Sequence, residues 1–145
     1  MLVEKQTSGH MLNAYYKLWV DAIAFEKGKR NNEVTWKAYT LVPVSLLMGI
    51  NLFTLLYWTN ELTHHNLPVL LIAHIFNNRL IDIFISIIIM YFIPFLLLNY
   101  LVIFYNQRYD LLMKIYQNVN GKLYRKYAWI SLGLLAIPVI LKWMF

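Results

Sequence analysis

The sequence predicts an all-α integral membrane protein with three transmembrane helices, an amphipathic N-terminal helix and a short interfacial or re-entrant helix. Three observations predict this class. Of the 145 residues, 60% are hydrophobic and only 14% are charged, which lies outside the range of soluble globular domains. Three apolar segments are long enough to cross a bilayer, whose core of about 30 Å needs roughly 20 helical residues. Most basic residues lie before the first of these segments and between the second and the third, which three spans place on the same side of the membrane, as the positive-inside rule requires.

The first predicted element is an amphipathic helix over residues 10–30 of a single membrane domain, 1–145. Seven residues repeat at helical spacing, and all but the last are apolar or aromatic: Met11, Leu12, Tyr15, Trp19, Ala22, Ile23 and Glu26. Asp21 and the basic run 27–30 lie elsewhere around the helix. This pattern is typical of a helix that lies on a membrane or on a neighbouring subunit.

Span one is predicted over residues 38–58, which carry no charge and end in the aromatic residues Tyr57 and Trp58. Aromatic side chains favour the interfaces of a bilayer. Ser45 and Gly49 give this span a face of small residues, which permits close approach of another helix and favours oligomerisation.

Span two is predicted over residues 80–104, and its 25 residues require a tilt or a kink at Pro94, which lacks a backbone donor. Helical spacing of apolar residues continues beyond it and allows an extension to residue 119, before the turn signal Asn120-Gly121. Span three is predicted over residues 127–145.

Residues 67–76 are too short to cross, and Pro68 and His74 interrupt them. We predict an interfacial or re-entrant helix here. Eleven of the 13 Lys and Arg residues lie in residues 1–37 and 105–126, which three spans place on one side. The positive-inside rule therefore predicts a multi-pass protein of the bacterial inner (cytoplasmic) membrane with a cytoplasmic N-terminus.

Polar groups inside the spans are the first functional candidates, because such groups are costly in lipid. Asn51, Ser86 and Asp82 are candidates for the polar lining of a path, which several subunits would have to enclose. The alternative is that they form hydrogen bonds between packed helices. Asp82 and Lys142 are both expected near the outer face, where they could form a salt bridge.

No catalytic residue, cofactor or metal site is predicted. The chain has no cysteine, which excludes disulfides, thiolate metal sites and Cys nucleophiles. His64, His65, His74 and Asp82 are of metal-ligand type, but their spacing matches no zinc motif. An intramembrane metal-dependent enzyme that uses His74 and Asp82 is the least favoured alternative.

Basic and aromatic residues alternate on the predicted cytoplasmic face. The basic candidates for ligand binding are Lys27, Lys29, Arg30, Arg108, Lys122, Arg125 and Lys126. Cations bind phosphates and rings stack on bases, so anionic lipid, a nucleotide or an oligonucleotide are the expected ligands. Duplex nucleic acid is not expected, because membrane topology already accounts for the net charge of +6.

This layout, with an amphipathic N-terminal helix, uncharged spans and a basic cytoplasmic loop, resembles the small multi-span membrane effectors of bacterial anti-phage defence. In the Hailong type, such effectors are paired with a nucleotidyltransferase. The resemblance covers the architecture and carries over no residue. It implies an oligomeric ion channel or channel-like protein that a nucleotide signal gates.

Two functions therefore remain open. The first is a homo-oligomeric channel-like membrane protein whose basic cytoplasmic face receives a signal, as a membrane effector in bacterial defence would. The second is a non-catalytic accessory or scaffold subunit of a larger membrane complex, which the absence of catalytic motifs and the many aromatic residues favour.

Overall fold

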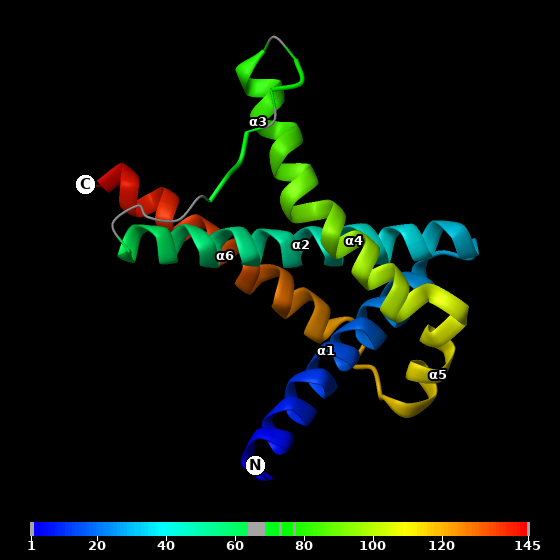
Figure 1. Ribbon diagram of the computed structural model, residues 1–145. Coiled ribbons are helices and arrows are strands. Elements are labelled where there is room, and N and C mark those ends of the chain that lie inside the picture. Colours follow the sequence, from blue (N-terminus) through cyan, green and yellow to red (C-terminus); the bar gives the residue numbers. More distant parts are fainter. Residues whose placement is uncertain (1, 64–68, 73, 77, 145) are drawn as a thin grey trace. The chain divides into compact units, whose positions relative to one another are not determined.

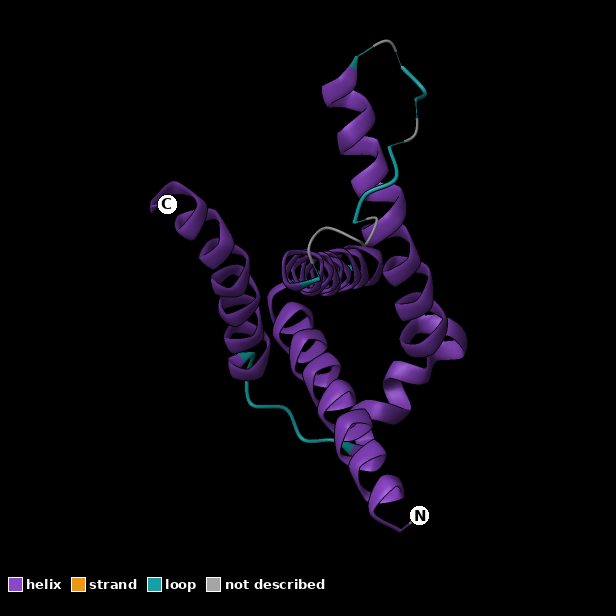
Figure 2. Ribbon diagram, turned by 60° about the vertical axis from the view of Figure 1, so that its left-hand side comes forward, coloured by secondary structure: helices purple, strands orange, loops and turns teal. Residues whose placement is uncertain are grey.

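The computed structural model describes residues 2–63, 69–72, 74–76 and 78–144, and all regular secondary structure in these ranges is helical. Figure 2 shows helices joined by loops. The helices are α1 (Leu2–Lys29), α2 (Glu33–Leu62), α3 (Arg79–Ile87), η1 (Ile88–Phe92), α4 (Ile93–Asn99), η2 (Tyr100–Phe104), η3 (Tyr105–Gln107), α5 (Arg108–Ile115) and α6 (Lys122–Met144). The predicted all-α class is confirmed.

The chain forms two compact units that differ in charge. The first, here called the basic unit, comprises Met1–Leu41 and Tyr100–Ala128, and the second, the apolar unit, comprises Val42–Asn99 and Trp129–Phe145. The basic unit carries the whole formal charge of +6. In the apolar unit the charged residues cancel one another: Glu61, Arg79, Asp82 and Lys142.

Two helical runs are long and apolar enough to cross a membrane. These are α2 and the run Arg79–Ile115, which extends from α3 to α5. They contain two of the predicted spans, residues 38–58 and 80–104. The third predicted span lies in α6, which is helical as far as Met144.

The run from α3 to α5 departs from regular α-helix first at the π turn η1 and then from the π turn η2 through η3. A π turn, η1, precedes Pro94, and the N–H of Ile93 donates to the carbonyl of Ile88. A proline ring clashes with the carbonyl four residues before it in a regular helix, and the wider π turn relieves this contact. The second irregularity includes Asn106 and Gln107, whose φ values are 52° and 55°. The helical run ends at Ile115, so the extension to residue 119 is wrong.

In the apolar unit, α2 packs closely against η1 and α4, and Figure 1 shows the crossing. A methyl group at Gly49 would clash with the carbonyl oxygen of Tyr91. Four residues earlier, Ser45 Oγ accepts a hydrogen bond of 3.0 Å from Asn99 Nδ2, and both residues are fully buried. The small-residue face of span one therefore packs within its own chain.

The described part of the predicted interfacial segment is not helical. Residues 69–72 and 74–76 form loop and bend, while residues 64–68, 73 and 77 lie outside the described ranges. The backbone N–H groups of Ile75 and Phe76 donate to the Asp82 carboxylate at 3.1 and 2.8 Å. A side chain of α3 thus supplies acceptors to this loop.

The predicted helix at residues 10–30 is part of α1, and the C-terminal part of its predicted apolar face is buried. Trp19 and Ile23 are fully buried, whereas Met11 is 72% exposed. Asp21, predicted to lie away from the apolar face, is also fully buried. Asp21 is buried because a loop of the basic unit packs on this part of α1, as described below.

The close contact at Gly49 makes a stability prediction. Gly49→Ala should destabilise the protein by about 1–3 kcal/mol, because the added methyl group forces α2 away from η1. Thermal unfolding in detergent measures this cost. Gly133→Ala is the matched control, since nothing lies within 4 Å of a Cβ there, and it should be neutral or stabilise α6 by about 0.5–1 kcal/mol. Equal melting temperatures for the two variants would contradict the packing described.

Candidate functional site

The basic unit contains all seven predicted ligand-binding cations, so it is the candidate site. Its core is a cluster of aromatic side chains from α1, α2 and the run that leads into α5. The rings of Trp19 and Phe104 lie 5.8 Å apart, and those of Trp36 and Tyr109 lie 5.3 Å apart, both edge to face. This geometry is the favoured one for aromatic pairs. All four side chains are buried, so they give the surface cations a rigid base.

A buried carboxylate joins α1 to the start of α6. Asp21 Oδ1 accepts hydrogen bonds from the backbone N–H groups of Val119 and Gly121 at 2.7 and 2.9 Å. Asp21 Oδ2 accepts from the N–H of Tyr124 at 3.1 Å. Helix α6 begins at Lys122, so Asp21 acts as an N-cap that is supplied from another helix.

The turn before α6 needs a glycine for two reasons. Asn120 and Gly121 have φ values of 54° and 77°, in the left-handed region that asparagine and glycine adopt most readily. A Cβ at Gly121 would also clash with the ring of Phe25. Phe25 therefore lies directly on this turn, and its ring centroid is 6.1 Å from that of Tyr124.

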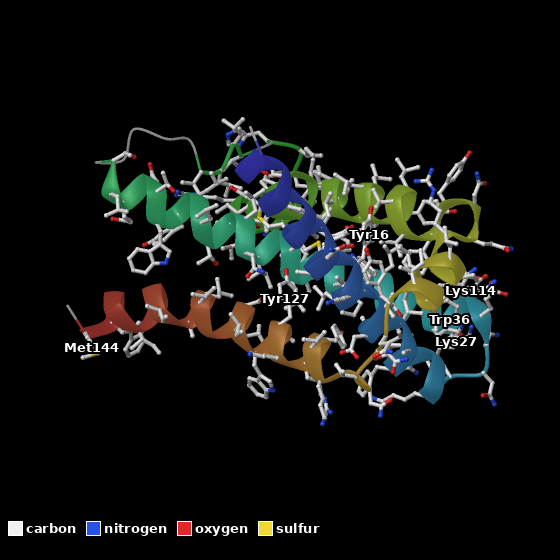
Figure 3. All side chains as sticks on the ribbon, turned by 90° about the horizontal axis from the view of Figure 1, so that it is seen from below. Tyr16, Lys27, Trp36, Lys114, Tyr127 and Met144 are labelled. Atoms are coloured by element: carbon white, nitrogen blue, oxygen red, sulfur yellow. The ribbon has the colours of Figure 1, made fainter. Side chains whose placement is uncertain are left out.

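Several cations of the site rest on aromatic rings of the same unit. Lys29 Nζ lies 3.6 Å from the ring centroid of Phe25, and Arg125 Cζ lies 5.7 Å from the same centroid. Lys27 Nζ lies 5.6 Å from the ring centroid of Trp36, and Figure 3 labels this pair. Cation–π contacts of this kind hold a charged group in place without neutralising it.

Other cations pair with carboxylates. Arg30 Nε lies 3.1 Å from Glu26 Oε2. Lys37 forms an ion pair with Glu33, which also accepts a hydrogen bond of 3.2 Å from the Tyr109 hydroxyl. The Lys37 hydrogen bond and charge lower the pKa of Glu33, and the hydrogen bond to Glu33 raises the pKa of Lys37.

Most of the seven predicted ligand-binding cations are exposed. Arg30 is half-buried, and the exposed ones are Lys27, Lys29, Arg108, Lys122, Arg125 and Lys126. Burial raises the pKa of Tyr15 to about 12 and also raises that of Tyr124. These phenols stay neutral at physiological pH, so they add no negative charge to oppose the cations.

The predicted polar lining of a path lies in the apolar unit. Asp82 is 2% exposed and accepts the two loop N–H groups described above. Ser86 is equally buried and donates to the Asp82 carbonyl at 2.7 Å. Asn51 is half-buried on α2. The pairing of Asp82 with Lys142 stays a prediction, because the Lys142 side chain lies outside the described part.

The histidines do not form a metal site within the described residues, where no group of three suitable ligands occurs. His74 Nδ1 lies 3.9 Å from Asp82 Oδ2. His64 and His65 lie outside the described residues. The alternative of an enzyme that uses His74 and Asp82 therefore rests on this one pair.

The apolar unit also contains a cavity of about 510 Å³ that sequence analysis did not predict. It lies between α2 and the α3–η1 run. Its lining is entirely apolar and includes Leu46, Gly49, Phe53, Phe84 and Ile88. Such a cavity offers no polar group that could orient a water molecule or an ion.

Sequence analysis also missed Asp21, although one signal could have indicated it. Asn120 and Gly121 precede a helix that begins with Lys122, and neither Gly121 nor Lys122 can cap that helix with a side-chain acceptor. A helix start without such a residue needs an acceptor from elsewhere. Asp21, an acid within α1, is a candidate for that acceptor.

Comparison of this chain with protein-family models, with curated proteins and with solved structures found no match.

Loss of the Asp21 carboxylate should destabilise the basic unit. Asp21→Ala leaves three N–H groups without their acceptor and should cost at least about 3 kcal/mol in the free energy of unfolding. Asp21→Asn should cost less, because its amide oxygen still accepts from Val119 and Gly121. Denaturant titration in detergent and amide hydrogen exchange at Tyr124 measure both effects.

The control is Asp110→Ala, which removes an exposed acid from the first turn of α5. It should cost no more than the roughly 0.3–1 kcal/mol of a charge near a helix terminus. If Asp21→Ala cost as little as this control, the carboxylate would not hold the turn.

Proposed function

We propose that this chain is a three-span membrane protein that assembles with copies of itself into a channel-like complex and receives a signal on its basic unit. The separation of charge between the two units is the observation that carries the proposal. The unit that contains most residues of the predicted spans has no net charge, and the other unit has all of it. This arrangement is the one that a bilayer and an anionic cytoplasmic leaflet favour.

Exposed apolar side chains support the membrane part of the proposal. In the apolar unit, Leu80 is 78% exposed, Phe84 65% and Trp129 75%. Exposed apolar side chains in such numbers favour a covering of lipid or of another protein. Residues on α6 share this exposure, which supports a third span there. In this proposal the basic ends of the three spans face the cytoplasm of a bacterial cell, and so does the N-terminus.

The channel-like part of the proposal rests on the small number of spans. Three helices cannot enclose a polar path, so a path requires several copies of the chain. Asn51, which is half-buried on α2, is a candidate to line it, together with Asp82 and Ser86 of α3. The resemblance to defence effectors supplies the physiological setting in this proposal: a nucleotide signal acting on the basic unit of a bacterial inner-membrane protein.

One observation favours the second candidate, a non-catalytic accessory or scaffold subunit. Asp82, Ser86 and Asn99 are buried and hydrogen-bonded within the apolar unit. Polar groups that are satisfied in this way add to the stability of the helix packing. A protein whose span residues all serve packing offers its outer apolar faces to larger partners.

The topology makes a prediction that the cysteine-free sequence allows us to test cleanly. A single cysteine introduced as Glu61→Cys should react with a membrane-impermeant maleimide added to intact spheroplasts. Lys114→Cys should react only after the membrane is permeabilised, because it belongs to the basic cytoplasmic face. Both residues are exposed, so burial does not explain a lack of reaction. The reverse pattern would overturn the proposed orientation.

Subunit number separates the two candidate functions. Native mass spectrometry of the protein extracted with its own lipids should show a closed homo-oligomer, and that complex should conduct ions in planar bilayers. Asn51→Leu should lower the conductance, whereas Val34→Ala, which changes an exposed residue of α2 outside the predicted span, should leave it unchanged. A monomer would end the channel proposal, and a stoichiometric larger partner would make the scaffold function the preferred one.

A further inference from the structure

Two cations from different helices converge on one ring in the basic unit. Lys29 lies at the end of α1, and Arg125 lies in the second turn of α6. Their charged groups are 3.6 and 5.7 Å from the ring centroid of Phe25. Within the described part of the chain, neither cation forms an ion pair with an acid. Like charges held near one another are unfavourable, and a bound anion relieves their repulsion.

The acids nearest to this ring along α1 are already engaged. Asp21 uses both carboxylate oxygens on the backbone N–H groups of the α5–α6 turn. Glu26 pairs with Arg30 at 3.1 Å. The positive charge of Lys29 and Arg125 is therefore left for a ligand from outside the chain.

The two cations are positioned before any ligand arrives. The Phe25 ring holds Lys29 and lies on the turn at Gly121, which the Asp21 carboxylate fixes. Arg125 Nε donates to the Gly121 carbonyl at 3.4 Å, which leaves the two terminal nitrogens of the guanidinium for a ligand. Arginine binds phosphate oxygens through such paired N–H groups.

Further cations lie on the same face of α6. Lys122 and Lys126 are three residues before and one residue after Arg125, and all three side chains are exposed. Positions 122, 125 and 126 fall on one side of a helix. A ligand held between Lys29 and Arg125 would thus lie within reach of additional positive charge.

From this geometry we infer that Lys29, Arg125 and the Phe25 ring form a binding site for an organic phosphate. The inference rests on the proposed function for its assignment of the basic unit as the face that receives a signal. The phosphate is carried either by a lipid headgroup or by a free nucleotide, and both present the same oxygens. An aromatic ring beside the cations also suits a nucleobase, which stacks on such rings.

Two probes separate the sources. The intact protein is placed in neutral phosphatidylcholine nanodiscs and titrated with ATP by calorimetry. In parallel, protein from nanodiscs that contain phosphatidic acid is analysed by native mass spectrometry, which counts the anionic lipids retained. Binding of ATP alone assigns a free phosphate, and retention of phosphatidic acid alone assigns a headgroup. Either result, or both, supports the site.

The double variant Lys29→Gln/Arg125→Gln should weaken the observed binding by about tenfold or more. The matched control, Lys17→Gln/Lys114→Gln, also removes two exposed charges and should change binding by less than about threefold, as expected for distant screened charges. Lys29→Arg keeps the charge and should retain binding. All these side chains are at the surface, and thermal unfolding confirms that each variant is folded.

Two outcomes would overturn the site. One is that neither ATP nor phosphatidic acid binds beyond the neutral lipid. The other is that both double variants lose binding equally, which would indicate diffuse attraction to the net charge. Subunit number and conductance are measured independently of phosphate binding. Failure of this site can therefore be distinguished from failure of the channel proposal.

Discussion

Backbone N–H groups outside helices need acceptors, and buried carboxylates meet this need in each unit. Asp82 accepts the N–H groups of the loop before α3, and Asp21 accepts those of the turn before α6. An unmet buried donor costs about 1–3 kcal/mol, which is a large fraction of the stability of a chain this size. Asp82, which the sequence marks as a functional candidate, and Asp21, which it does not, therefore both hold irregular backbone segments in place.

The two long apolar helical runs were predictable because length and hydropathy decide them locally. A segment such as residues 38–58 must be helical in lipid, since its own backbone has to satisfy every N–H and carbonyl. The break at Asn106 and Gln107 was not predictable, because the segment contains no glycine or proline and a single asparagine is a weak signal for left-handed backbone. The close contact at Gly49 was predictable as a small-residue face, but the sequence could not say which helix would meet it.

The sequence predicted which cations belong to the candidate site, but it did not predict the contacts that bring them together. Counting cations found Lys29 and Arg125, yet their positions lie 96 residues apart in the sequence, and only the fold brings them to one ring. The role of Asp21 is also a long-range property, because its hydrogen-bond partners follow it by about a hundred residues. Helical periodicity predicts on which face of its own helix a residue lies. It does not predict which distant loop of the chain covers that face.

The distinction between an ion pair and a cation–π contact decides which cations can act on a ligand. Arg30 beside Glu26 contributes little net field, because the carboxylate cancels its charge. Lys29 Nζ lies 3.6 Å from the ring centroid of Phe25, and this ring carries no net charge. The full charge of Lys29 therefore still attracts an anion. Residues of both kinds count alike toward the net charge of the chain. The structure separates them, because Arg30 is paired with a carboxylate, whereas Lys27 and Lys29 rest on rings that leave their charge uncancelled.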